Sequence, residues 1–275
     1  MLLPNRSPKS SRSIDDRALT AAVTPSSLPA RALAFLGVER GERRSVGLMT
    51  AHSFFMGCGT VFFETAASAS FLARFESKFI PWVYLAAAVA NIATGSIYAR
   101  VQKRASFSGL MKGTLWFLLA LVVTVRLGFA VSSVAWVAFA GLVSYRIISS
   151  LTDLEYWAVA SRIYDVRQAK RLFGFVGTGE VVARIAGSFC VPILVKFGGV
   201  TNLMELSAVA LALCLFFVGR VLHGVPGVHS PAPEPTAAAP RRTLREGLHE
   251  IVSSPYLAVV VAVAVLATFG KYFVD

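Results

Sequence analysis

Apolar segments about as long as a membrane crossing recur along this chain of 275 residues. A helix needs roughly 20 apolar residues to cross the hydrocarbon core of a bilayer. Such segments occupy residues 46–70, 80–100, 107–128, 133–155, 173–195, 201–221 and 255–274. The chain is also 55% hydrophobic and only 15% charged, whereas soluble domains are about 25% charged. These features predict an all-α integral membrane protein with a lipid bilayer as its surroundings.

The basic residues indicate orientation in the membrane rather than nucleic-acid binding. The formal net charge is +12, but Lys and Arg gather in the N-terminal tail and in short loops. The loop after the fourth span contains four of them, Arg162, Arg167, Lys170 and Arg171. Because cytoplasmic loops carry an excess of Lys and Arg, we expect a multi-pass protein of the cell inner (plasma) membrane with a cytoplasmic N-terminus. We expect no nucleic-acid partner.

The segments outside the spans suggest a simple domain organisation. Residues 1–30 are rich in Ser, Pro and Arg and predict a disordered cytoplasmic tail. Residues 31–45 predict an interfacial helix, and residues 46–221 a six-span bundle. Residues 222–254 are a Pro/Ala-rich cytoplasmic linker. Residues 255–275 form the seventh span, and we expect a second half to be missing.

Charged side chains inside the spans are candidates for a binding site. Each costs several kcal/mol in hydrocarbon unless it faces protein or water, so such residues usually serve a function. We take these residues as substrate- or ion-binding candidates: Glu64, Arg146, Asp153, Glu180, Arg184 and Lys271.

The fourth span has a polar face, because Arg146, Ser149, Ser150, Asp153 and Trp157 recur at helical spacing. This face either lines a substrate cavity, or its charges pair with neighbouring helices.

Glu180 and Arg184 are four residues apart, with the acid first, and can neutralise each other. Similar depth in the membrane also makes an Arg146–Glu180 contact possible.

His52 is either a proton-coupling residue or a partner for a neighbouring helix.

Small residues recur every fourth position in two spans, a spacing that lets membrane helices approach closely. One ridge is Gly179, Ala183 and Gly187; the other is Ala87, Asn91, Gly95 and Ala99. We interpret both as packing surfaces.

The sequence shows no metalloprotease motif, serine nucleophile elbow or acidic metal cluster, and its three cysteines lie in separate spans. We therefore expect neither an enzyme nor a cofactor.

A longer pattern adds a family resemblance. The stretch at 156–187, YWAVASRIYDVRQAKRLFGFVGTGEVVARIAG, contains the motif D-x-R-Q-A-K-R-L-F-G. Three further segments lie elsewhere in the chain: GVERGERR, FLARFESKFIPWVYLAAAV and TFGKYFVD. Together they resemble the ATP/ADP antiporter (nucleotide translocase) family and related bacterial transporters of the major facilitator type. The resemblance covers roughly residues 36 to 275 and corresponds to the N-terminal half of such a transporter.

The resemblance implies a major facilitator-like six-helix bundle plus a seventh transmembrane helix, completed by a second half or a second copy. It implies a secondary active transporter that moves a small anionic or nucleotide-like solute by alternating access, with or without a coupling ion. Arg146 and Lys271 would contact the anion, and Glu64 or Glu180 would couple an ion or proton. Where nucleotide-carrying members have basic residues, this chain has Glu64 and Thr65. The alternative is a non-transporting membrane sensor or anchor derived from such a transporter.

Overall fold

The computed structural model describes residues 38–39, 41–131, 134–224 and 253–274, and every element in them is helical. The helices are α3 (Arg43–Leu72), the short 3-10 helix η1 (Ser77–Phe79), α4 (Ile80–Gln102), α5 (Phe107–Val131), α6 (Ala135–Ile163), α7 (Val166–Val176), α8 (Thr178–Gly198), α9 (Asn202–Gly224) and α11 (Pro255–Val274). Six helical segments are long and apolar enough to cross a membrane. The first six predicted spans and the all-α membrane class are thereby confirmed, and the protein is a multi-pass membrane protein.

The chain divides into two compact units, Met1–Val228 and His229–Asp275. The second unit contains α11, an apolar helix that begins with proline at a position where its missing N–H costs no hydrogen bond. The backbone carbonyl of Ser254 accepts the N–H of Ala258 at 3.0 Å and so opens the helix. That α11 crosses the membrane as a seventh span stays a prediction.

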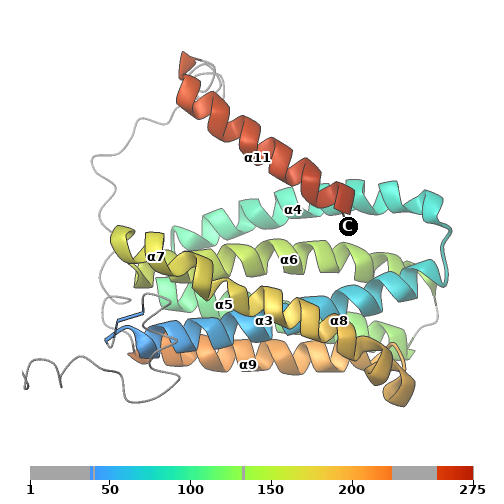
Figure 1. Ribbon diagram of the computed structural model, residues 1–275. Coiled ribbons are helices and arrows are strands. Elements are labelled where there is room, and N and C mark those ends of the chain that lie inside the picture. The colour runs from blue at the N-terminus through green and yellow to red at the C-terminus, as the bar shows by residue number, and fades with distance from the viewer. Residues whose placement is uncertain (1–37, 40, 132–133, 225–252, 275) are drawn as a thin grey trace, which may run out of the picture. The chain divides into compact units, whose positions relative to one another are not determined.

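In the first unit, α3 and α6 form the centre of a helix bundle, and the other long helices pack around them (Figure 1). In their most apolar stretches, 56% of the residues of α3 and 50% of those of α6 are buried, against 11% in α4 and in the segment containing α8. The largest buried side chains of this core include Phe63, Phe71, Met49, Met56, Met111 and Leu115. Two helices of the unit therefore keep wide faces that no other described helix of the same unit covers.

α8 packs on α3 through the predicted ridge, because Gly179, Ala183 and Gly187 are its buried residues. A Cβ atom built on Gly179 would lie 2.5 Å from the backbone oxygen of Thr50. Gly57 of α3 is equally tight from the other side, 2.8 Å from the backbone oxygen of Glu180. The backbones of the two helices approach so closely that only glycine fits, and the prediction of a packing ridge is confirmed for α8.

The second predicted ridge behaves differently. Ala87 of α4 is buried with Val83, but Gly95 and Ala99 are exposed. A Cβ atom on Gly95 would meet nothing within 4 Å. Within the described part of the first unit, the prediction of a packed ridge along all of α4 is wrong. Small-residue spacing shows that a helix can approach a neighbour, not that a neighbour is there.

Several boundaries differ from the sequence prediction. α6 ends at Ile163 rather than at residue 155, and the predicted fifth span, 173–195, is broken between α7 and α8 at Gly177. Within the predicted interfacial helix 31–45, residues 43–45 are the first turn of α3, while residues 31–37 and 40 lie outside the described residues. The predicted tail and nearly all of the predicted linker also lie outside them.

Candidate functional site

Three of the candidate residues meet where α8 packs on α3. The Nε atom of Arg184 donates to Oε1 of Glu180, one turn earlier on α8, at 3.0 Å. The Nη1 atom of the same guanidinium lies 3.8 Å from Oε2 of Glu64 on α3. We call Glu64, Glu180 and Arg184 the central charged cluster. The intrahelical pair agrees with the spacing of the sequence, whereas the contact from α8 to α3 is established only by the fold.

α6 adds two residues beside the central charged cluster. The hydroxyl of Tyr145 interacts with the Glu64 carboxylate and lies near the charges of Arg184 and Arg146. Arg146 turns toward α4, where its Nη2 donates to the hydroxyl of Tyr84 at 2.7 Å. Its guanidinium also lies 4.6 Å from the Tyr84 ring centroid, a favourable cation–π distance. The Arg146–Glu180 contact stays a prediction.

The central charged cluster is partly open to the surroundings. Side-chain exposure is 27% for Glu64, 27% for Glu180 and 33% for Arg184. Two carboxylates and one guanidinium give the cluster a formal charge of −1. Glu180 also lies in the first turn of α8, where the positive end of the helix dipole favours an acid. The backbone N–H of Glu180 donates to Ser53 Oγ of α3 at 2.9 Å, which fixes the cluster to the bundle.

The polar face of α6 lies along the outside of the first unit. Ser150 and Trp157 are exposed and Asp153 is half-buried, whereas Ser149 is 8% exposed and belongs to the interior. Asp153 lines a groove of about 510 Å³. The other residues of this groove come from α4 and α6: Tyr98, Gln102, Ser150, Leu154, Trp157, Ala158 and Ser161. The structure therefore places Asp153 on a different part of α6 from the central charged cluster.

Lys271, the sixth candidate, lies in α11 of the second unit. Its side chain is outside the described part of the chain, so its role as an anion contact stays a prediction.

A buried pair of titratable side chains was missing from the candidates. Nε2 of His52 on α3 lies 3.0 Å from Oε2 of Glu155 on α6, and both side chains are completely buried. The Sγ atom of Cys214 on α9 donates to the backbone oxygen of His52 at 3.4 Å. The ring of Tyr156 stacks on the imidazole with centroids 6.1 Å apart. One of the two alternatives for His52, a partner on a neighbouring helix, is therefore what the structure shows, and it is compatible with proton coupling.

Glu155 escaped sequence analysis because the fourth span was predicted to end there. With α6 continuing to Ile163, Glu155 lies about 12 Å inside the helix at ~1.5 Å per residue. The signal that could have found it is the run after it, in which Tyr156, Trp157 and Val159 continue the apolar pattern.

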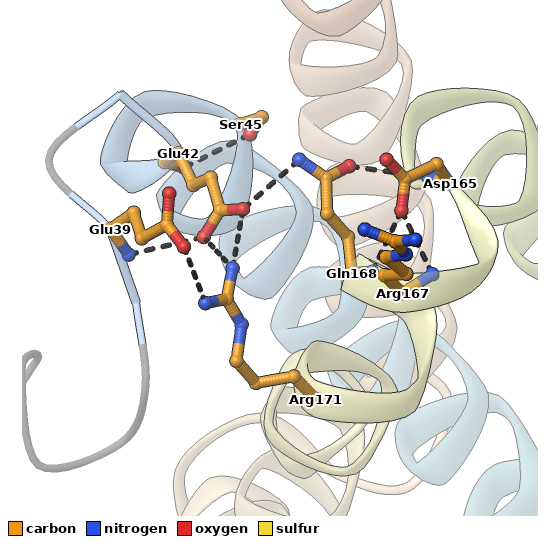
Figure 2. Close-up of polar contacts among 7 residues, drawn as sticks. All are labelled: Glu39, Glu42, Ser45, Asp165, Arg167, Gln168 and Arg171. Carbon is orange, nitrogen blue, oxygen red and sulfur yellow. Dashed lines mark hydrogen bonds and ion pairs between the residues drawn. The ribbon is translucent and has the colours of Figure 1, made fainter.

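A second polar network lies where α3 and α7 begin. Asp165 opens α7: its Oδ1 accepts the backbone N–H groups of Arg167 and Gln168 at 2.9 and 2.8 Å, and the side chain of Gln168 accepts the N–H of Asp165. This reciprocal pattern is a capping box with an acid at the N-cap. Figure 2 shows that the same Gln168 reaches Glu42, which precedes α3, and donates to its Oε1 at 3.0 Å.

Arg171 completes this network, which we call the α3–α7 clamp: Glu39, Glu42, Asp165, Gln168 and Arg171. Its guanidinium binds Glu39 Oε1 at 2.7 Å and Glu42 at 2.6 and 2.8 Å (Figure 2). Hydrogen bonding to Glu39 raises the pKa of Arg171, which keeps it charged. The most specific motif of the sequence, D-x-R-Q-A-K-R, thus supplies the residues that join α7 to the segment before α3.

Loss of Arg171 is expected to loosen both ends of the clamp. In Arg171→Gln, Glu39 and Glu42 lose their cation, so amide hydrogen exchange should speed up at the start of α3 and throughout α7. Because Glu39 and part of Arg171 are exposed, added salt should produce a weaker version of the same change in the native protein. Lys170→Gln is the matched control, since it removes the same charge from an exposed neighbour and should leave the exchange rates unchanged. Equal rates in Arg171→Gln and the native protein would contradict the clamp.

Within the described residues, no group of three or more His, Cys, Asp or Glu side chains is arranged to hold a metal ion.

Comparison with protein-family models, with curated proteins and with solved structures gave no match.

Proposed function

We propose that this protein is a secondary active membrane transporter, or the N-terminal half of one, that moves a small charged solute by alternating access. The observation that carries the proposal is the central charged cluster, which three ionised side chains form within two membrane helices. One unpaired Arg or Glu at the centre of a membrane helix costs about 2.5–3.5 kcal/mol on insertion scales. Half-exposed charges in such a place are typical of a solute or ion pathway.

The position of the cluster supports a pathway rather than a purely structural role. Glu64 lies well inside α3, and the cluster remains about one-third to one-quarter exposed. A pair that served only to hold α3 against α8 would be unnecessary, because the glycine ridge already joins these helices. The exposed side of the cluster is therefore available for contact with a solute or with a second bundle.

A second bundle would enclose the cluster. The wide uncovered faces of α4 and α8 are the surfaces that such a bundle could cover, and alternating access arises when two bundles rock around a shared central site. In this proposal, the second bundle is either the second half of a longer protein or a second copy of this chain.

The charges of the cluster constrain the solute. Arg184 is already held by two carboxylates, and a net charge of −1 attracts a cationic group. The anionic or nucleotide-like solute that the resemblance implies would have to be held by Arg146 and Lys271 instead. A solute that carries both charges, with its cationic group at Glu64 or Glu180, fits both sets of residues.

Uptake into vesicles tests the proposal. The full-length protein would be reconstituted into liposomes and offered labelled nucleotides, small organic anions, small organic cations and zwitterions, with empty liposomes as the control. We expect uptake of at least one class above the control. No uptake of any class by protein whose helical content is intact would overturn the proposal.

One observation favours the alternative of a non-transporting sensor or anchor. Glu180 and Arg184 neutralise each other within one turn of α8, so the cluster does not require a solute to be stable. The uptake experiment separates the two functions. A sensor or anchor would translocate no solute, so liposomes containing it would take up no more label than empty liposomes.

A further inference from the structure

We propose that His52 and Glu155 form a binding site for one exchangeable proton, and that release of this proton opens the contact between α3 and α6. The inference rests on the proposed transport function, in which this proton would be the coupling ion. It replaces Glu64 and Glu180 in that role, since both of these carboxylates are already bound by Arg184.

The first step of the argument is the burial of the pair. His52 and Glu155 have no exposed side-chain surface, and a single 3.0 Å contact joins Nε2 to Oε2. The pair is neutral overall when it carries two protons, either as an imidazolium beside a carboxylate or as an Nδ1-protonated imidazole beside a carboxylic acid. If one of these two protons leaves to water, a neutral imidazole and a carboxylate remain with a net charge of −1, and an uncompensated charge in an apolar interior is strongly unfavourable.

The second step concerns atoms that have no partner. Nδ1 of His52 and Oε1 of Glu155 are buried and make no hydrogen bond to any described residue. Buried polar atoms in native proteins are nearly always hydrogen-bonded. A purely structural buried pair would be expected to satisfy all four of its polar atoms. The two unsatisfied atoms, one on each residue, give the pair the capacity to exchange protons with incoming water.

The third step is the surroundings of the pair. The titratable groups that act on it from the neighbouring helices are Cys214 of α9, Tyr98 of α4 and Tyr156 of α6, and Tyr156 is in turn affected by Tyr164 and by Glu180 of α8. Glu180 is paired with Arg184. Thiol and phenol groups are neutral near pH 7, so Glu155 has no competing cation among these groups and depends on the proton for its neutrality.

The fourth step links the proton to movement. His52 is followed by Ser53, whose Oγ accepts the N–H of Glu180 and so holds the first turn of α8. Loss of the proton favours hydration of Glu155, which requires α3 and α6 to separate. Displacement of this part of α3 acts directly on the start of α8 and on the central charged cluster. The proton site and the proposed solute site are therefore mechanically connected through adjacent residues of one helix.

Cys214 provides a natural reporter, because it is completely buried and touches the backbone of His52. Two variants of the full chain would be placed in nanodiscs, and each would keep a single cysteine. The first keeps Cys214 and has Ser in place of Cys58 and Cys190. The second keeps the exposed Cys190 and has Ser in place of Cys58 and Cys214. Thiol reactivity itself rises with pH, so the measured quantity is the ratio of the maleimide labelling rates of Cys214 and Cys190.

We expect this ratio to rise by about tenfold between about pH 6 and about pH 9, as release of a single proton allows. In Glu155→Gln, which keeps a neutral hydrogen-bonding partner for His52, the ratio should stay low and independent of pH. A ratio that does not change with pH in the native pair would overturn the proton site, whether or not the variant folds. An equal rise in Glu155→Gln would also overturn it, since another group would then control opening. Neither outcome affects the uptake experiment, which tests transport separately.

Discussion

Replacement of Arg184 by glutamine is expected to abolish solute uptake by the reconstituted protein while the helix bundle remains folded. Without the guanidinium, Glu64 and Glu180 lose their shared cation and the cluster changes its net charge by one unit. Interactions with a charged group in a partly buried site are worth about 1.5–3 kcal/mol each, so a loss of about 100-fold in the initial uptake rate is expected. Labelled-solute uptake at matched protein density measures it.

The substitution Arg184→Lys sharpens this prediction. Lysine keeps the charge but has a single compact ammonium, which cannot contact Glu180 and Glu64 as the two edges of the guanidinium do. We expect a partial loss, between those of glutamine and the native residue.

Arg126→Gln is the matched control for the central charged cluster. Arg126 of α5 also forms an ion pair between two membrane helices, with Glu205 of α9 at 2.7 Å. It lies outside the cluster, so uptake should be close to that of the native protein. Similar losses in Arg126→Gln and Arg184→Gln would show that the cluster has no special role in transport.

Substitution of Gly179 by leucine is expected to detach α8 from α3 and to prevent stable folding of the first unit. Even a Cβ atom at this position would lie 2.5 Å from the Thr50 carbonyl oxygen and 3.1 Å from the Phe54 nitrogen. These are backbone atoms, which can move away only if the helices separate. Overpacking a well-packed site costs about 1–3 kcal/mol, and occasionally more, and we expect the upper end of this range. Thermal unfolding in detergent, followed by circular dichroism, measures it.

Gly113→Ala is the control for helix glycines in general. Gly113 lies in α5, and a Cβ atom there would meet nothing within 4 Å. Since alanine is the better helix former by about 1 kcal/mol in water, the midpoint of unfolding should stay the same or rise. A midpoint for Gly179→Leu as high as that of Gly113→Ala would contradict the close approach of α8 to α3.

The positions of the spans could be predicted from hydropathy because a membrane crossing imposes a minimum length on every apolar helix. Their ends were not defined by hydropathy, since the apolar pattern of α6 continues past Glu155 without a clear stop and the fold shows that the helix runs to Ile163. The same reason hid the His52–Glu155 pair. The glycine ridge of α8 was predictable from spacing, but the identical spacing in α4 leaves Gly95 exposed. The sequence of a helix shows which face can pack closely, whereas the position of the neighbouring helix is known only from the fold.

The candidate site shows the same division. Glu180 and Arg184 could be paired from the sequence, because residues four apart always meet on a helix. The contact of Arg184 with Glu64 joins positions far apart in the chain and depends on how α8 lies against α3. Likewise, the motif around Gln168 and Arg171 was recognisable as a pattern, whereas its partners Glu39 and Glu42 emerged from the fold.

The central claim, that a solute crosses the membrane at the central charged cluster by alternating access, is tested most directly by counterflow. Vesicles containing the full-length protein would be loaded with an excess of the unlabelled solute that scored in the uptake panel, and entry of the labelled solute would be followed. The account predicts transient accumulation of label above its outside concentration with native protein, and none with Arg184→Gln. Label that equilibrates without overshoot in the native protein, or an overshoot of equal size in Arg184→Gln, would contradict the account.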